Sequence, residues 1–194
     1  GVIIRNNGAN FGGGLYATGS SISLVSVSID SNIAYWGAGL YSENSSSNIE
    51  NTNISFNHAF IEGGAIYQNG NNLTISETAI TSNTGLDFGG ALVCYMGIMD
   101  LDRCTVAGNI ANYGSAFNLR EAVVTVSNSI IWENGENTVY SSSGSQASMF
   151  NLGYTNFYGG ENYLSNSSSI ILDWGEGNLN TDPLFCNPEE NDFA

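Results

Sequence analysis

The sequence has 194 residues, of which 18 are acidic and only three are basic, so its formal net charge is −15 at pH 7. A chain of this length forms one domain with a substantial core, and a hydrophobic content of 42% argues against intrinsic disorder. So acidic a surface repels phosphate backbones and anionic polymers, which excludes nucleic acid as a partner. No apolar run reaches the roughly 18 residues of a membrane-spanning helix. The 24 glycines and two prolines indicate tight turns and little helix.

A repeat of 25 or 26 residues runs through residues 1–134. In each unit an asparagine follows an aliphatic residue by three positions, and apolar residues alternate with polar ones. The recurring asparagines are Asn7, Asn32, Asn57, Asn83, Asn109 and Asn134. Alternation of this kind is typical of strands with one buried face. Short strands at constant spacing bury those faces when successive coils stack, so the sequence predicts an all-β, right-handed parallel β-helix of about six or seven coils.

Two details of the repeat predict local structure. Each asparagine is expected at a bend between strands, where it tolerates left-handed backbone angles and hydrogen-bonds the asparagine of the next coil. A glycine-rich block follows, as in GGGLY and GAGLY, because close backbone approach in a crowded corner needs small residues. A β-sandwich also has short strands and turns, but it does not require matched residues at constant spacing.

The repeat fades after Asn134, and residues 135–194 are expected to form irregular closing coils of the same single domain, residues 1–194. The first coil begins in register at Val2, which predicts that further coils or a cap precede Gly1 in a longer protein. The cysteines are Cys94, Cys104 and Cys186. Their number and spacing indicate neither a zinc site nor a disulfide scaffold, so they are expected to be small buried side chains, with a Cys94–Cys104 bridge left open.

The motifs resemble those of two groups of bacterial proteins. Pairing GGA blocks with an aliphatic-x-x-Asn motif is similar to the repeats of polymorphic outer membrane proteins, although Ile or Val stands where Phe is usual. Residues 128–132 (NSIIW) and 177–185 (GNLNTDPLF) resemble the end of secreted β-helix proteins of the pectin-lyase-like type. The resemblance covers essentially the whole chain and implies a parallel β-helix that is secreted or on the cell surface. It does not imply one activity, because the superfamily includes lyases, hydrolases, adhesins and stalks.

Asp100 and Asp102 form the best candidate catalytic pair. They flank Leu101, a core position, so both point outward about 7 Å apart, a separation that suits an inverting glycosidase. Their Ser, Thr and Asn neighbours would not raise the pKa of an acid, so a solvated acidic face is preferred to catalysis. Calcium binding by the same acids is a second alternative, and no other cofactor is expected. Arg103 is expected to form a surface ion pair.

Aromatic residues form the candidate binding surface. Tyr16, Tyr41 and Tyr67 each follow a core aliphatic residue, so they are expected to stack outward about 4.8 Å apart. A second group, in the turn before them, consists of Phe11, Trp36, Phe60 and Tyr113. Such ladders stabilise sheets, and exposed aromatics are also surfaces on which neutral glycans stack.

These features together predict a non-catalytic, secreted or cell-surface β-helix. We expect an adhesin, stalk or filament component that binds neutral glycans or surface proteins. The alternative is a polysaccharide-active enzyme of the glycoside hydrolase or lyase type.

Overall fold

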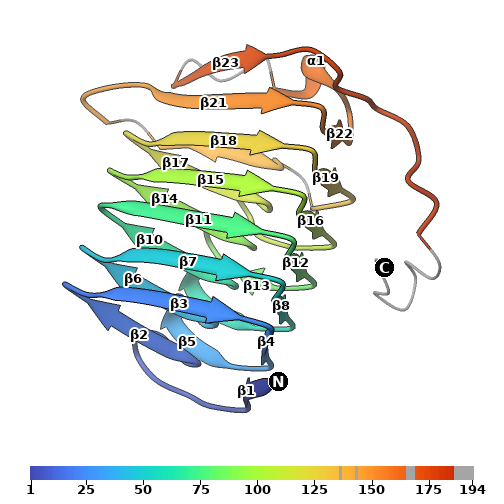
Figure 1. Cartoon of the computed structure of the whole chain (residues 1–194). Coiled ribbons are helices and arrows are strands. Elements are labelled where there is room, and N and C mark those ends of the chain that lie inside the picture. The colour runs from blue at the N-terminus through green and yellow to red at the C-terminus, as the bar shows by residue number, and fades with distance from the viewer. Residues whose placement is uncertain (136, 143, 165–168, 186–194) are drawn as a thin grey trace.

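The computed structural model of the chain describes residues 1–135, 137–142, 144–164 and 169–185. Its strands stack as a parallel β-helix of about seven coils, wound in the right-handed sense (Figure 1). Equivalent strands of successive coils pair in parallel, as in β4 with β8. The one helix among the described residues is α1 (Glu161–Leu164). The predicted all-β solenoid is confirmed.

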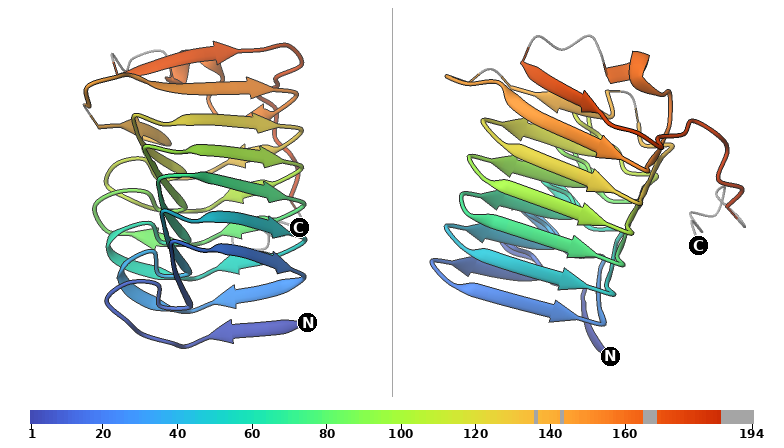
Figure 2. Two further views of the ribbon diagram at one scale, coloured as in Figure 1. Left: turned by 60° about the vertical axis from the view of Figure 1, so that its left-hand side comes forward. Right: turned by 45° about the horizontal axis from the view of Figure 1, so that its top comes forward.

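Three long sheets form the walls of the stack, and a short fourth sheet fills the remaining side (Figures 1 and 2). Sheet A contains β1 (Val2–Arg5), β4 (Val27–Asp30), β8 (Asn53–Ser55), β12 (Ala79–Thr81), β16 (Thr105–Ala107), β19 (Ile130–Trp132) and β22 (Asn156–Phe157). Sheet B contains β5 (Ile33–Trp36), β9 (His58–Glu62) and β13 (Thr84–Gly85). Sheet C contains β2 (Leu15–Thr18), β6 (Leu40–Glu43), β10 (Ile66–Asn69), β14 (Leu92–Tyr95), β17 (Phe117–Arg120) and β20 (Val139–Ser141). Sheet D contains β3 (Ser21–Val25), β7 (Ser46–Glu50), β11 (Asn72–Ser76), β15 (Ile98–Asp102), β18 (Val123–Ser127), β21 (Ser148–Gly153) and β23 (Ile170–Trp174).

Alternation along each strand places one set of side chains in a continuous core. In β11, Leu73 and Ile75 are buried, whereas Thr74 between them is exposed. Leu73 pairs with Met99 and Ile75 pairs with Leu101 in the next coil, so buried aliphatic residues form columns along the helix axis. Burial of these columns against one another removes their apolar surface from water and holds the coils together.

The six recurring asparagines form a hydrogen-bonded ladder at the corner between sheets A and B. The Nδ2 atom of each of the first five donates to Oδ1 of the next asparagine at 2.9–3.0 Å. The left-handed angle expected for the asparagine itself falls on the preceding residue, as in Ser31 (φ 57°) and Phe56 (φ 55°). The prediction that the recurring asparagine itself adopts the left-handed conformation is therefore wrong. The backbone N–H of the ladder asparagine also donates to the next Oδ1, so the bend is taken up one residue earlier.

The glycine blocks meet two separate requirements at the entrance to sheet C. Gly37 has a φ of 59°, a conformation that residues with a Cβ adopt only with strain. Gly39 lies so close to the next coil that a Cβ atom would be 2.5 Å from the carbonyl oxygen of Ala65. These glycines therefore allow the chain to turn from sheet B into sheet C at normal coil spacing.

The closing coils are irregular. The elements from β20 to β23 continue the stack, and after β23 the chain leaves it and runs back along its side (Figure 1). Leu179 still pairs with the chain around β22, because its N–H donates to Thr155 O at 2.9 Å. Cys94 and Cys104 are buried free thiols, and burial raises the pKa of Cys94 to about 12 and that of Cys104 to about 11. Cys186 lies outside the described residues.

Candidate functional site

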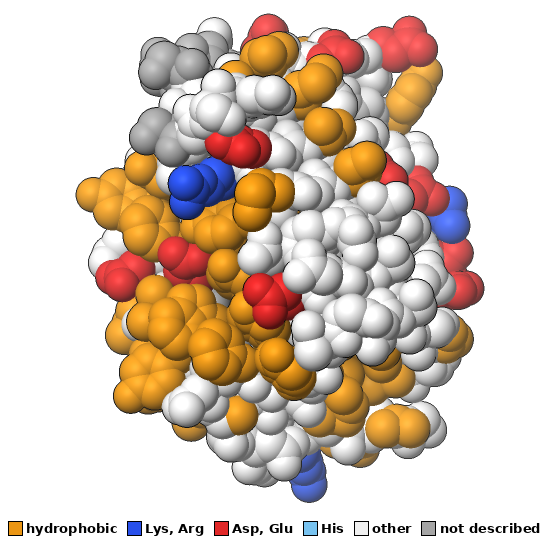
Figure 3. Space-filling view, turned by 90° about the vertical axis from the view of Figure 1, so that its left-hand side faces the viewer, with side chains coloured by type: hydrophobic (Ala, Val, Ile, Leu, Met, Phe, Trp, Pro, Cys, Tyr) orange, Lys and Arg blue, Asp and Glu red, His pale blue; other side chains and the backbone are white. Residues whose placement is uncertain are grey.

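Aromatic side chains cover the outer side of sheet C and the adjoining sheet B, a surface that we call the aromatic face. In Figure 3, hydrophobic side chains gather over part of this side of the stack, with acidic and basic side chains among them. The aromatic face comprises Phe11, Tyr16, Tyr35, Trp36, Tyr41, Phe60, Tyr67, Phe88, Tyr95, Tyr113 and Tyr140. Single exposed apolar residues are ordinary on a protein surface, but a contiguous group indicates an interaction site.

The tyrosine ladder lies on the outer side of β2, β6 and β10. The rings of Tyr16 and Tyr41 are 5.4 Å apart and those of Tyr41 and Tyr67 are 4.9 Å apart, with interplanar angles of 9° and 5°. Tyr41, the inner ring, therefore has both of its faces covered by its neighbours. Tyr16 is 54% exposed, but Tyr41 only 7%. That these tyrosines contact a sugar chain stays a prediction, and of the three, Tyr16 offers the most accessible ring.

A second column precedes sheet C and differs from the one expected. Isolated bridges and strand register align Phe11, Trp36, Glu62, Phe88 and Tyr113. Phe60, which we expected in this column, lies two residues earlier, in β9. The column could have been found from the sequence, since each member directly precedes the first glycine of its glycine-rich block. Sequence reasoning missed that its third member is a carboxylate.

Two coils contain an extra residue next to this column. In β5 two positions separate Ala34 from Trp36, whereas in β9 three positions separate Ala59 from Glu62. The register shift is a β-bulge, and the next coil shares the extra residue, because Ala59 pairs with Gly85 and Glu62 pairs with Phe88, three positions later in both coils. The bulge accounts for the change in the repeat from 25 to 26 residues. Bulges commonly redirect side chains beside functional sites.

Two rings beside the bulge are among the accessible rings of the aromatic face, together with Tyr16, Tyr113 and Phe11. Tyr35 and Phe60 are 47% and 43% exposed, and their rings lie 5.4 Å apart at an interplanar angle of 49°. Because they are tilted rather than stacked flat, they are not covered by each other as the ladder rings are. The sequence did not single out Tyr35, although its neighbour Ala34 is a core position and alternation places Tyr35 outside.

Glu62 is half-buried among these rings. The hydroxyl of Tyr95 interacts with its carboxylate, and Nδ2 of Asn118 donates to that hydroxyl at 2.8 Å. Burial raises the pKa of Glu62, the interaction with Tyr95 opposes this rise, and the nearby charge of Asp87 adds to it. Burial also raises the pKa values of Tyr67 and Tyr95, and the charge of Glu62 raises them further. These side chains form one electrostatically coupled group.

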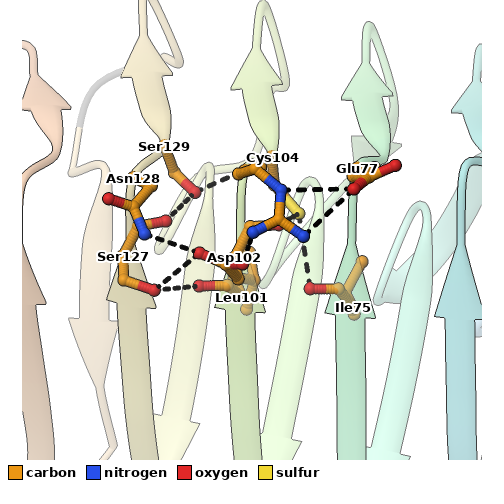
Figure 4. Close-up of polar contacts among 9 residues, drawn as sticks. Ile75, Glu77, Leu101, Asp102, Cys104, Ser127, Asn128 and Ser129 are labelled. Carbon is orange, nitrogen blue, oxygen red and sulfur yellow. Dashed lines mark hydrogen bonds and ion pairs between the residues drawn. The ribbon is translucent and has the colours of Figure 1, made fainter.

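The carboxylates expected to be catalytic lie on sheet D. Asp100 and Asp102 both point outward from β15, as the alternation predicts. Asp102 accepts hydrogen bonds from Asn128 Nδ2 at 2.7 Å and Ser127 Oγ at 3.1 Å, and it pairs with Arg103 (Figure 4). These bonds, that of Asn128 first, lower the pKa of Asp102. A general acid needs the opposite shift.

Arg103 forms the surface ion pairs expected of it. Its NH2 atom lies 3.0 Å from Glu77 Oε1, and its NH1 atom pairs with Asp102 (Figure 4). Within the described residues, no group of three or more His, Cys, Asp or Glu side chains is arranged to hold a metal ion. No helix of that part of the chain is long and apolar enough to cross a membrane.

Comparison with known proteins gives no relative: no family model, no curated protein and no solved structure matches this chain.

Proposed function

We propose that this protein is a non-catalytic, secreted or cell-surface β-helix of the pectin-lyase-like type, an adhesin, stalk or filament component that binds a neutral glycan through its aromatic face. The resemblance of its repeats to those of bacterial surface proteins supports the location. The exposure of Tyr35 and Phe60 on a rigid parallel sheet is the observation that supports the binding. Sugar rings present C–H groups that pack against aromatic faces, and two such faces side by side suit two parts of an extended chain.

The tyrosine ladder has a supporting role in this proposal. Tyr41 stacks between Tyr16 and Tyr67, and Phe11 connects this ladder to the second column through its contacts with Tyr41 and Trp36. Preorganised rings lose little conformational freedom on binding, which favours affinity. Each contact is weak, so the display of several copies on one surface would strengthen attachment.

Titration with neutral hexasaccharides tests the proposal. A glycan array identifies the best neutral ligand, and calorimetry compares the wild type with a Tyr35→Ala/Phe60→Ala variant. We expect at least a tenfold loss of affinity, the equivalent of about 1.4 kcal/mol. Tyr154→Ala is the matched control, because Tyr154 is exposed but lies outside the aromatic face. Unchanged binding by a folded double variant would contradict the proposal.

A polysaccharide-active enzyme is the second candidate, favoured by the outward placement of Asp100 and Asp102 on one strand. Its test is turnover on a panel of neutral and uronate polysaccharides. Product formation that Asp102→Asn abolishes would replace the binding proposal with this one.

A further inference from the structure

The aromatic column is interrupted by a carboxylate at its centre. Glu62 occupies the position between Trp36 in the coil before and Phe88 in the coil after. Trp36 stacks on Phe11 on its other side at 4.9 Å, and Phe88 stacks on Tyr113 at 5.4 Å. The two stacks thus end at Glu62, so that this coil offers a charged oxygen pair where the others offer a ring.

One polar group beside Glu62 is a buried acceptor without a donor. The donor groups near the Glu62 carboxylate are the hydroxyl of Tyr95, Nδ2 of Asn118, which donates to that hydroxyl at 2.8 Å, and the guanidinium of Arg120. Oδ1 of Asn118 has no hydrogen-bond partner among the described residues, although Asn118 is fully buried on the outward side of β17. A buried acceptor without a donor is unusual in a folded protein. The acceptor that a ligand can reach here is the half-buried Glu62 carboxylate, which suits a ligand that brings donors.

The charges around Glu62 indicate the sign of the charge that such a ligand carries. Asp87 lies near enough to act on the Glu62 carboxylate, and Glu43 acts on the neighbouring Tyr41 and Tyr67. Arg120 is the one nearby cation, but the ion pairs of the described residues are both formed by Arg103. Carboxylates partly withdrawn from water attract a cation more strongly than exposed ones do, and aromatic rings add a cation–π contribution.

We propose that the aromatic face binds a glycan with free amino groups more tightly than a neutral one, and that a protonated sugar amine binds at Glu62 and Asp87 while neighbouring sugar rings pack on Tyr35 and Phe60. This inference rests on the proposed glycan-binding function and names its substrate class: a polymer of 2-amino sugars. The ammonium group supplies hydrogen-bond donors and a positive charge at the point where the face has acceptors and negative charge. A protein of net charge −15 also attracts such a polymer from a distance.

Three hexasaccharides that differ only at carbon 2 test the inference. The glucosamine hexamer carries an amine, the N-acetylglucosamine hexamer an acetamide and cellohexaose a hydroxyl group, and titration is done at a pH where the amine is protonated. We expect the amine form to bind about tenfold more tightly than the other two, as a charge-assisted hydrogen bond would give. Equal binding of all three would overturn the inference and leave the glycan-binding proposal intact. Binding of none would overturn both.

Two matched variants separate the Glu62 site from general attraction by an acidic protein. Glu62→Gln keeps the shape of the side chain and an acceptor oxygen but removes the charge, so it should abolish the preference for the amine. Glu50→Gln makes the same change at an exposed position at the end of β7, in sheet D, and should preserve the preference for the amine. If both variants reduced amine binding equally, or if Glu62→Gln had no effect, the site would not be the one that we propose.

Discussion

At the scale of single residues, the asparagine ladder joins three coils at each step. Nδ2 of Asn83 donates to Asn109 Oδ1 at 3.0 Å and to Ile54 O at 2.9 Å, and its Oδ1 accepts from both nitrogens of Asn57 at 3.0 Å. Asn83 is fully buried, so water cannot replace these bonds. Loss of one asparagine therefore leaves several buried groups unpaired at once.

The ladder predicts a large effect of Asn83→Ala on stability. We expect the free energy of unfolding to fall by about 3 kcal/mol, because the buried Ile54 carbonyl and the Asn57 amide lose their partners. Asn48→Ala, at an exposed position of β7, is the control and should change it by less than about 0.5 kcal/mol. Urea unfolding of both variants measures the difference. Equal losses would show that the ladder has no special role.

Glu62 predicts a pH-dependent stability. Its pKa is higher in the folded state than in the unfolded state, so it stabilises the fold below its unfolded pKa, and that contribution is lost as pH rises through the folded pKa. At neutral pH, Glu62→Gln should raise the free energy of unfolding by at most about 1 kcal/mol, because the group is only half-buried. The gain should shrink as pH falls toward the unfolded value of about 4.3.

Asp102→Asn is the control, because its effect on the free energy of unfolding should have the opposite sign. The pKa of Asp102 is lowered in the folded state, so its contribution is present at neutral pH and is lost as pH falls through the folded pKa. Asp102→Asn should therefore reduce stability at neutral pH, and the difference from wild type should also shrink on acidification. Denaturant melts at several pH values compare the two variants. If both substitutions changed the free energy of unfolding in the same direction at neutral pH, the raised pKa of Glu62 and the lowered pKa of Asp102 would be contradicted.

At the scale of elements, the aromatic face depends on paired bulges in adjacent coils. The extra residue of β9 is matched by one after β13, because Ala59 pairs with Gly85 and Glu62 pairs with Phe88, three positions later in both coils. Insertions in a solenoid are tolerated where they stay in register with the next coil.

The matched bulges predict that deletions of their extra residues have coupled effects on the free energy of unfolding. Removal of Ile61 alone makes the coil of β9 one residue shorter than the coil of β13, and it should destabilise the protein by about 2 kcal/mol or more, because the hydrogen bonds from Asp87 and Phe88 are lost. Removal of both Ile61 and Asp87 restores equal coils and should recover at least about 1 kcal/mol. A double-mutant cycle by urea unfolding measures the coupling. Additive losses would show that the bulges are independent.

The repeat predicts the fold because the same physical requirement recurs in every coil. The spacing of Ile29, Ile54 and Ile80 is enough to place a buried column, and the asparagine three residues later is enough to place a corner. The bend residue could not be predicted, because Ser31, Phe56 and Gly108 share a backbone conformation but no side-chain chemistry. The bulge was visible only as a 26-residue step, since spacing alone does not say which residue is extra.

The candidate site was harder to predict because it joins residues from different columns. Glu62 comes from β9, whereas Tyr95 and Asn118 come from β14 and β17 of another sheet, and none of the three is a motif in itself. Tyr16, Tyr41 and Tyr67 could be aligned from the sequence, but the tight stacking that covers Tyr41 depends on ring orientation. Alternation predicts which side of a sheet a residue faces, and not which neighbours cover it.

At the scale of the whole molecule, charge opposes folding. Eighteen acidic residues against three arginines leave most carboxylates without a cationic partner, and both ion pairs of the described residues share Arg103. Repulsion among like charges destabilises a compact state, and dissolved salt screens it over about 10 Å at 0.1 M. The calcium that the acidic sequence suggested would act differently, because a binding site needs several oxygens around one ion.

This repulsion predicts that added salt of any kind raises the thermal stability of the protein. The melting temperature should increase with sodium chloride by about 2–4 °C for each kcal/mol of repulsion that is screened. Screening depends on ionic strength and ion charge, so on this account calcium chloride should raise it no more than magnesium chloride at equal ionic strength. Calorimetric scans in the three salts make the comparison. A calcium effect clearly larger than that of magnesium, and lost in Asp100→Asn/Asp102→Asn, would instead assign a calcium site to β15, since magnesium shares the charge but not the flexible coordination of calcium.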